Sequence, residues 1–156
     1  NYDIDIENNM LVITIDEKYP LFIVLRVEKN ISIPCLVDEN RNVIDSGRFF
    51  RTVMPIIIVE KEFFEDESNG LFIKNVFDNL SAIEKEKTGF AGELDEVEIY
   101  PNRELRVKLK SRKTDFFIKN DLSGFKKIEK SAAYLDAVNS YPETLDLRDK
   151  RVLIRQ

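Results

Sequence analysis

The sequence contains no histidine, and this absence removes most of the familiar catalytic arrangements. Histidine is the commonest general base, the commonest metal ligand, and the group that activates serine or cysteine nucleophiles. There is a single cysteine, Cys35, so no disulfide can form within the chain. Cys35 lies in an apolar run over residues 33–37 and is expected to be a small buried hydrophobic residue.

Glycine is also scarce, and the five glycines are scattered, so there is no Gly-rich phosphate loop. The CxxC, HExxH and GxSxG motifs are missing as well. Carboxylates remain as candidate catalytic or metal-binding groups, and the densest cluster holds Glu60, Glu62, Glu65, Asp66 and Glu67. Oxygen ligands suit Ca²⁺ and Mg²⁺, but the cluster lacks the spacing and central glycine of an EF-hand. We therefore interpret it as a solvated turn and helix start, and expect neither a metal nor a cofactor.

Charge and hydropathy narrow the class of protein further. The net charge is −5 and both signs are mixed along the chain, which argues against a nucleic-acid partner. Hydrophobic residues make up 43% of the chain, enough to bury a core. No apolar run reaches the roughly 20 residues needed to cross a bilayer, and no signal peptide is visible. Because the chain begins at Asn1 without an initiator methionine, we expect any anchor or targeting segment to lie upstream.

The first 60 residues show the alternation of β-strands. Residues 2–7 and 11–16 predict a hairpin whose turn is Asn8-Asn9, since asparagine tolerates positive φ. Further strands are predicted over residues 21–27, 31–37, 43–44 and 54–59. The order of these segments places a domain boundary near Tyr19-Pro20.

The rest of the chain mixes helices and strands. Helical spacing predicts one helix from about residue 65 to 87, ended by Gly89, and a second that begins at the N-cap Asp121 and ends near residue 138. Between them, residues 94–100, 105–110 and 116–118 predict a three-stranded meander, and residues 145–147 and 152–154 predict closing strands. This order of strands, helix, meander, helix and strand predicts an α+β fold with a mainly antiparallel sheet and two helices.

Three pairs of adjacent phenylalanines lie in or near these predicted elements: Phe49-Phe50, Phe63-Phe64 and Phe116-Phe117. Neighbours in a strand point to opposite faces, so each pair is expected to place one ring in the core and one outward. An outward ring is either covered by a helix, the commoner case, or forms part of a partner site.

The C-terminal segment alternates apolar and charged residues, as a half-exposed strand does. A terminal strand is often the edge of a sheet, where unpaired backbone groups can be completed by a partner strand. Flanking charges can equally protect such an edge from association. The alternation by itself leaves both interpretations open.

Several short motifs resemble the FtsQ/DivIB family of bacterial cell-division proteins. Residues 144–155 (TLDLRDKRVLIR) are similar to the family's closing "hydrophobic-Asp-Leu-Arg … Val-x-Val-Arg" strand. Residues 11–20 (LVITIDEKYP) resemble the last strand of its POTRA domain with the "Glu-Arg-x-Pro" exit, with Lys18 in place of arginine. Residues 36–44 (LVDENRNVI) resemble its "Leu-Val-Asp-x-x-Gly-x-Val" turn, with Arg41 where glycine is usual, and Met54-Pro55 stands where the family has Leu-Pro.

This resemblance implies a domain organisation and a location. Residues 1–19 would be the C-terminal hairpin of a POTRA-like domain, and residues 20–156 an FtsQ/DivIB-like β domain. Family members are single-pass proteins of the cell inner (cytoplasmic) membrane that act at the division septum. The resemblance therefore implies an upstream membrane helix, with this domain on the periplasmic or extracytoplasmic side.

The resemblance also implies a function without catalysis. Family members are scaffolds that bind FtsB and FtsL, or DivIC and FtsL, partly by pairing a partner strand with their own last strand. Carried over position by position, the partner-binding residues are Arg148, Asp149, Lys150, Arg151, Val152, Leu153, Ile154 and Arg155. Asp149 stands where some members carry an aromatic residue, so an aromatic anchor is lost or replaced there. The alternatives are another POTRA-containing envelope assembly or transport scaffold, and an enzyme that uses carboxylates or a bound metal.

Overall fold

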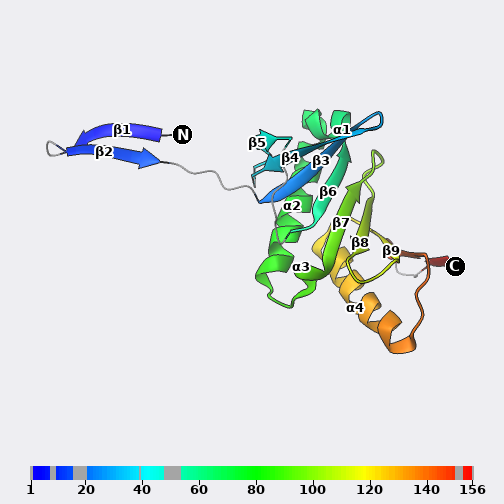
Figure 1. The fold of residues 1–156 in the computed structure, drawn as a ribbon. Helices are drawn as coiled ribbons and strands as arrows, with labels where there is room; N and C mark the ends of the chain where they lie inside the picture. Colours follow the sequence, from blue (N-terminus) through cyan, green and yellow to red (C-terminus); the bar gives the residue numbers. More distant parts are fainter. Residues whose placement is uncertain are drawn as a thin grey trace.

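A computed structural model describes residues 2–7, 10–15, 21–38, 40–47, 54–149 and 153–155 (Figure 1). The strands are β1 (Tyr2–Glu7), β2 (Met10–Ile15), β3 (Phe22–Glu28), β4 (Ile31–Val37), β5 (Val43–Ser46), β6 (Ile56–Glu60), β7 (Leu94–Ile99), β8 (Leu105–Leu109), β9 (Asp115–Ile118), β10 (Thr144–Asp146) and β11 (Leu153–Arg155). The helices are α1 (Lys61–Glu65), the 3₁₀ turn η1 (Glu67–Asn69), α2 (Gly70–Lys85), α3 (Phe90–Glu93) and α4 (Leu122–Val138).

The main sheet is mixed, and this overturns the predicted α+β fold with a mainly antiparallel sheet and two helices. Nine strands run in the order β11-β10-β9-β8-β7-β6-β3-β4-β5. The pairs β3–β6, β6–β7 and β9–β10 are parallel, and the other pairs are antiparallel. With four α-helices in the described part of the chain, the architecture is α/β.

Two of the three parallel pairs, β6–β7 and β9–β10, follow from the way in which helices connect the strands. Parallel neighbours need a crossover connection, usually a helix, because a tight turn reverses the chain. The segment from α1 to α3 connects β6 to β7, and α4 connects β9 to β10. The sequence prediction treated the helices as separators between antiparallel groups, which is why it missed these βαβ units.

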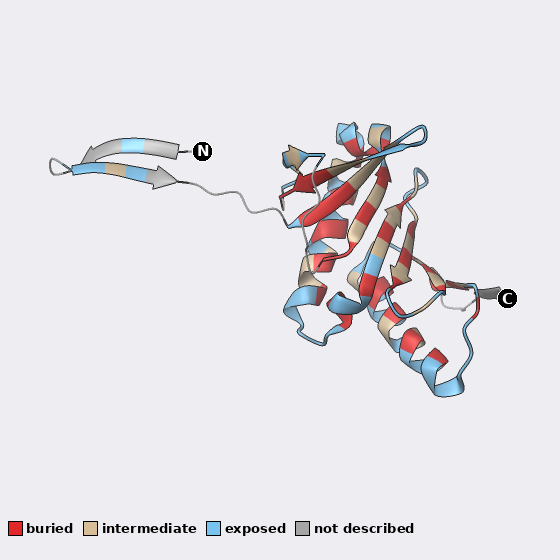
Figure 2. Cartoon of the chain, viewed as in Figure 1, coloured by how far each residue is buried: buried red, intermediate tan, exposed pale blue. Residues whose placement is uncertain are grey.

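The long helices α2 and α4 pack on one face of the main sheet, and the hydrophobic core lies between these helices and the strands (Figure 2). Val76, Phe77 and Leu80 of α2 and Phe125 and Ile128 of α4 are buried against the inward residues of the strands. Cys35 is also fully buried there, as the sequence predicts. Over β7 to β9 the opposite face carries charged cross-strand pairs instead, such as Lys108–Glu96 at 2.7 Å.

The phenylalanine pairs behave differently according to the element that contains them. In β9, Phe116 is fully buried and Phe117 is half-buried on the other face, as predicted for a strand. Phe63 and Phe64 are both buried, which contradicts the prediction, because they lie in α1, where adjacent side chains do not alternate between two faces. Phe49 and Phe50 lie outside the described residues.

The turn between β4 and β5 is built around Asp38. The carboxylate of Asp38 accepts hydrogen bonds from the backbone N–H of Asn40 at 2.9 Å and of Asn42 at 2.8 Å. Arg41 adopts φ 69°, a left-handed conformation that glycine adopts without steric cost. Its Nη2 donates to the carbonyl oxygen of Phe64 at 2.8 Å, and its guanidinium lies 5.6 Å from the Phe64 ring centroid. The long side chain therefore ties this turn to α1.

Strands β1 and β2 form a two-stranded antiparallel sheet of their own, and the predicted hairpin is confirmed. Ile4 is opposite Ile13, and Leu11 is opposite Ile6. The exposed fractions of Ile4, Leu11 and Ile13 are 54%, 65% and 55%, so apolar side chains of the hairpin face solvent. The predicted turn at Asn8-Asn9 and the predicted boundary at Tyr19-Pro20 lie outside the described residues.

Candidate partner-binding edge

The C-terminal edge of the main sheet begins at β10, which is anchored tightly to β9. Leu145 is opposite Phe116 in a parallel register, and both side chains are buried. The ladder is extended by a hydrogen bond from the Leu147 N–H to the Phe117 carbonyl oxygen at 2.8 Å. The hydroxyl of the fully buried Thr114 donates to the carbonyl oxygen of Pro142 at 2.7 Å, which fixes the chain just before β10.

The Asp146-Leu147-Arg148 segment alternates between the two faces of the sheet. Leu147 is only 2% exposed and belongs to the core, and its carbonyl oxygen accepts a hydrogen bond from Lys127 Nζ of α4 at 3.0 Å. Asp146 and Arg148 are half-buried and bonded to each other. The leucine thus secures the end of β10 in the core, while the flanking charged residues interact with each other.

Arg148 is held by two carboxylates and a ring. Its Nε donates to Asp146 Oδ1 at 2.9 Å, and its Nη2 donates to Asp146 Oδ2 at 2.5 Å, which is a bidentate arrangement. Its Nη1 pairs with Glu104, which precedes β8. The guanidinium also lies 5.8 Å from the ring centroid of Phe117, within the range of a cation–π interaction.

These contacts stabilise the charged form of the guanidinium. Hydrogen bonding to Asp146 raises the pKa of Arg148 above its ordinary value, against a smaller opposing effect of burial. The side chain of Arg148 remains 31% exposed, so it is also accessible to solvent. Arg148 is therefore a fixed positive charge at the base of the C-terminal edge.

The residue after Arg148 is exposed. The side chain of Asp149 is 82% exposed, and its Oδ1 lies 3.8 Å from Lys119 Nζ. Strand β11 then pairs antiparallel with β10, with Leu153 opposite Asp146, Ile154 opposite Leu145 and Arg155 opposite Thr144. The predicted partner-binding residues Lys150, Arg151 and Val152 lie outside the described residues, and the role of the whole segment stays a prediction.

No family model matches the chain, and no curated protein sequence is significantly similar to it.

The described part of the main sheet has a second outer strand, β5, at its other end. Its register with β4 shifts between Leu36 and Val37, which is a β-bulge or a similar irregularity. Bulges are one device by which proteins keep edge strands from pairing with other chains. The two ends of the sheet are therefore not equivalent, because the irregularity lies at the β5 end and the β10–β11 register is regular.

The residues that fix Arg148 were missed by the sequence prediction. Glu104 and Phe117 are far from Arg148 in sequence and reach it because β8, β9 and β10 are neighbours in the sheet. The available signal was the outward position predicted for one ring of the Phe116-Phe117 pair. A parallel partner for β9 would have placed that ring beside the Asp146-Leu147-Arg148 segment.

The acidic cluster does not form a metal site in the described residues, where no group of three or more candidate ligands converges. Glu65 instead pairs with Arg26 at 3.1 Å, and Asp66 accepts a hydrogen bond from the Ser68 N–H at 2.8 Å to cap η1. This agrees with the interpretation as a turn and helix start. Separately, the helices described here include none with the length and apolar character of a membrane span.

Proposed function

We propose that this chain is a non-enzymatic scaffold domain of the bacterial divisome, similar to FtsQ/DivIB, that binds other membrane-anchored division proteins through its C-terminal edge strand. The partners would be of the FtsB/DivIC and FtsL type. The observation that carries the proposal is the position of β11 as an outer strand of the main sheet. An outer strand presents backbone donors and acceptors that an extended segment of a partner can complete.

The turn around Asp38 supports the similarity to the FtsQ/DivIB family independently of the tail. The family's usual residue at the position of Arg41 is glycine, and Arg41 has φ 69°. A turn that needs positive φ explains why glycine is usual at this position. The hydrogen bond to Phe64 and the packing on its ring explain how arginine is accommodated here.

The β1–β2 hairpin supports the proposed division into a POTRA-like segment (residues 1–19) and a β domain (residues 20–156). An isolated two-stranded hairpin is marginally stable in water and needs further strands or a helix against its apolar face. The exposed Ile4, Leu11 and Ile13 provide such a face. We propose that it packs within a POTRA-like domain, and that the full-length protein is anchored in the inner membrane by one upstream helix, with this domain outside the membrane at the septum.

The decisive experiment removes β11 and keeps β10. Ending the chain after Asp149 deletes the outer strand, whereas Leu145 and Leu147 remain in the core. We expect both the shortened and the complete chain to unfold cooperatively. We expect the shortened chain to lose binding to the purified extracytoplasmic segment of the FtsB/DivIC-type protein from the same organism. Calorimetric titration measures the affinity. A shortened, folded chain that binds this segment with unchanged affinity would refute the proposal.

A matched pair of proline substitutions tests which edge is used. Proline removes a backbone donor and disturbs strand pairing. Ile154→Pro in β11 is expected to weaken partner binding strongly, and Ile44→Pro in the other outer strand, β5, is expected to leave it unchanged. The reverse pattern would assign partner binding to β5.

A further inference from the structure

A groove lies on the helix side of the main sheet, away from the residues discussed above. It has a volume of about 540 Å³ and is lined by the loop after α2, by α3, by the end of β8 with the turn that follows, and by α4. None of its lining residues belongs to β10 or β11. Its volume is within the range of about 300–1,000 Å³ that is typical of ligand sites.

The floor of the groove is apolar. Phe90, Leu109 and Ala132 line it, and each is at most 7% exposed. On α4 the neighbouring lining residue is Ala133, which is exposed. The hollow exists because α4 presents two alanines here, and larger side chains at these positions would fill it. An occupant can therefore bury an aliphatic stem against the floor.

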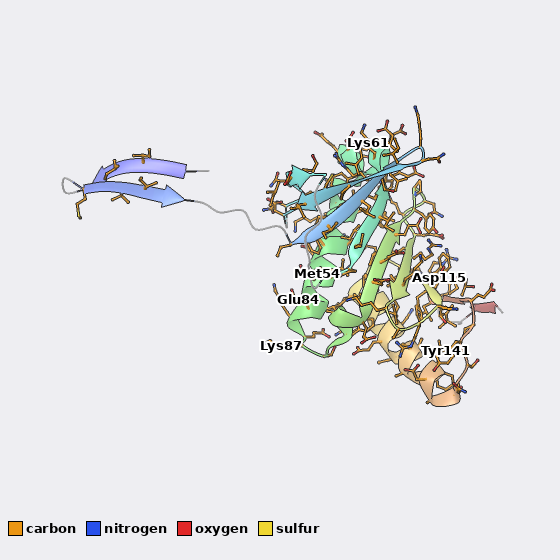
Figure 3. The ribbon with its side chains drawn as sticks, in the orientation of Figure 1. Met54, Lys61, Glu84, Lys87, Asp115 and Tyr141 are labelled. Atoms are coloured by element: carbon orange, nitrogen blue, oxygen red, sulfur yellow. The ribbon has the colours of Figure 1, made fainter. Side chains whose placement is uncertain are left out.

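Among the described lining residues, the charges are three carboxylates and one guanidinium, that of Arg112. Arg112 is already fully engaged: Nε donates to Asp136 Oδ1 at 3.2 Å, Nη2 pairs with Asp136 Oδ2, and Nη1 donates to the Ser111 hydroxyl at 3.0 Å. Asp136 also accepts a hydrogen bond from the hydroxyl of Tyr141, just beyond the end of α4 (Figure 3). The charges of Arg112 and Asp136 therefore neutralise each other.

The two other lining carboxylates are Glu93 and Glu129. Glu93 accepts a hydrogen bond from the Ser111 hydroxyl at 3.0 Å, and neither carboxylate forms an ion pair within the part of the chain that the structure describes. Among the described residues, the groove thus combines an apolar floor with two carboxylates that form no ion pair. Lysine and arginine match this combination, because each has an aliphatic stem and a cationic end.

We propose that this groove binds a basic side chain, arginine or lysine, carried by an extended segment of a protein partner. The stem lies on Phe90 and Ala132, and the cation faces Glu93 and Glu129. This site goes beyond the proposed edge pairing and is independent of it, because the two share no residue.

The test uses the 156-residue chain and two blocked tripeptides, Ac-Ala-Arg-Ala-NH₂ and Ac-Ala-Glu-Ala-NH₂, at low ionic strength. Amide chemical shifts are followed by NMR during the titration. We expect the arginine peptide to shift the amides of Gly89, Gly92 and Ala133 and to saturate in the millimolar range, and the glutamate peptide to have no local effect. Equal responses to both peptides, or no response of these amides, would overturn the proposal.

Matched variants separate charge from shape. Glu129→Gln is expected to weaken binding of the arginine peptide about threefold to fivefold, the effect of losing one partly exposed ion pair. Glu84→Gln, on an exposed position of α2 outside the groove (Figure 3), is expected to change nothing. Ala133→Leu fills the groove and is expected to abolish binding. Ala137→Leu adds the same atoms to an exposed position of the same helix outside the groove and should leave binding intact.

The variants also distinguish this proposal from the proposed edge function. The chain ended after Asp149 is expected to bind the arginine peptide as the complete chain does. Ala133→Leu, in turn, is expected to retain binding of the FtsB/DivIC-type segment at the edge. If Ala133→Leu and Ala137→Leu bind the arginine peptide equally well, the groove is not its site.

Discussion

Gly70 and Arg41 are predicted to be energetically coupled, although 28 positions separate them in the sequence. Gly70 is the first residue of α2 and has ordinary helical backbone angles, so alanine fits its conformation. A Cβ atom placed on it, however, would lie well inside van der Waals contact with Arg41 Nη1. The substitution Gly70→Ala therefore displaces the guanidinium from the Phe64 carbonyl and ring.

The size of the effect follows from what the guanidinium loses. A hydrogen bond with a charged donor contributes about 1.5 kcal/mol, and a partly exposed cation–π contact about 0.5 kcal/mol. The gain in helix propensity from glycine to alanine is at most about 1 kcal/mol. We expect Gly70→Ala to lower the free energy of unfolding by about 1 kcal/mol in the natural chain. In an Arg41→Gly background, where the guanidinium is absent, the same substitution should be neutral or stabilising.

The assay is a double-mutant cycle by urea denaturation of the natural chain, the two single variants and the double variant. The expected coupling energy is about 2 kcal/mol. Gly92→Ala is the control, because no atom outside its immediate neighbours lies within 4 Å of its added Cβ, and its effect should be the same in both backgrounds. If Gly70→Ala has equal effects with and without Arg41, the guanidinium does not depend on the glycine and the reasoning is refuted.

Three further predictions concern α4 and the C-terminal edge. Gly124→Ala should lower the free energy of unfolding, measured by urea denaturation, by about 2 kcal/mol. The added Cβ would lie 2.7 Å from the carbonyl oxygen of Lys119, a backbone atom that cannot move away as the end of a flexible side chain can. An unchanged stability would contradict this prediction. Burial favours a raised pKa for the Asp121 carboxyl, but hydrogen bonds from Ser123 and from the Gly124 N–H outweigh it and lower the pKa below 3.8. The stabilising effect of this cap is therefore complete above pH 4 and is lost as the pH falls through the lowered pKa. The difference in free energy of unfolding between the natural chain and Asp121→Ala should shrink from pH 7 to pH 2. A constant difference would contradict the assignment of Asp121 as the cap. Arg148→Lys keeps the charge and loses the bidentate geometry, so the urea midpoint should fall by an amount equivalent to about 1 kcal/mol, and an unchanged midpoint would show that charge alone suffices.

Local features of the sequence predicted local structure well. Helix α4 begins after Asp121, which accepts a hydrogen bond from the Gly124 N–H at 2.7 Å, as the predicted N-cap requires. The β7–β8 hairpin and the β1–β2 hairpin were predicted from alternation and turn residues, both of which are properties of neighbouring positions. Such signals need no knowledge of the rest of the chain.

Strand neighbours far apart in the sequence could not be predicted in this way. The parallel pair β3–β6 encloses β4 and β5 in sequence, and alternation within a strand says nothing about which partner it takes. The sequence prediction missed helix α1 for a different reason. It follows β6 directly, its N-cap Glu60 makes no side-chain capping bond, and its two phenylalanines look like strand residues. Burial against the sheet fixes this short helix, and burial is not visible in the sequence.

At the candidate edge, too, a local feature was predicted from the sequence and a long-range contact was not. The alternating tail suggested an outer strand from sequence alone, and β11 is an outer strand in the main sheet. The contacts of Arg148 required knowledge of the pairing of β9 with β10.

The two unlike ends of the main sheet also restrict how copies of this chain could associate. Pairing of β11 with the β11 of a second copy is isologous, so a two-fold axis closes it into a dimer. Pairing of β11 with the β5 of another copy is heterologous, and each added copy would offer a fresh β5, so that assembly would continue as a fibre. The irregular register at Leu36 and Val37 distorts β4 beside β5 and works against this second mode. The bulge therefore favours a closed pair through β11 over a fibre.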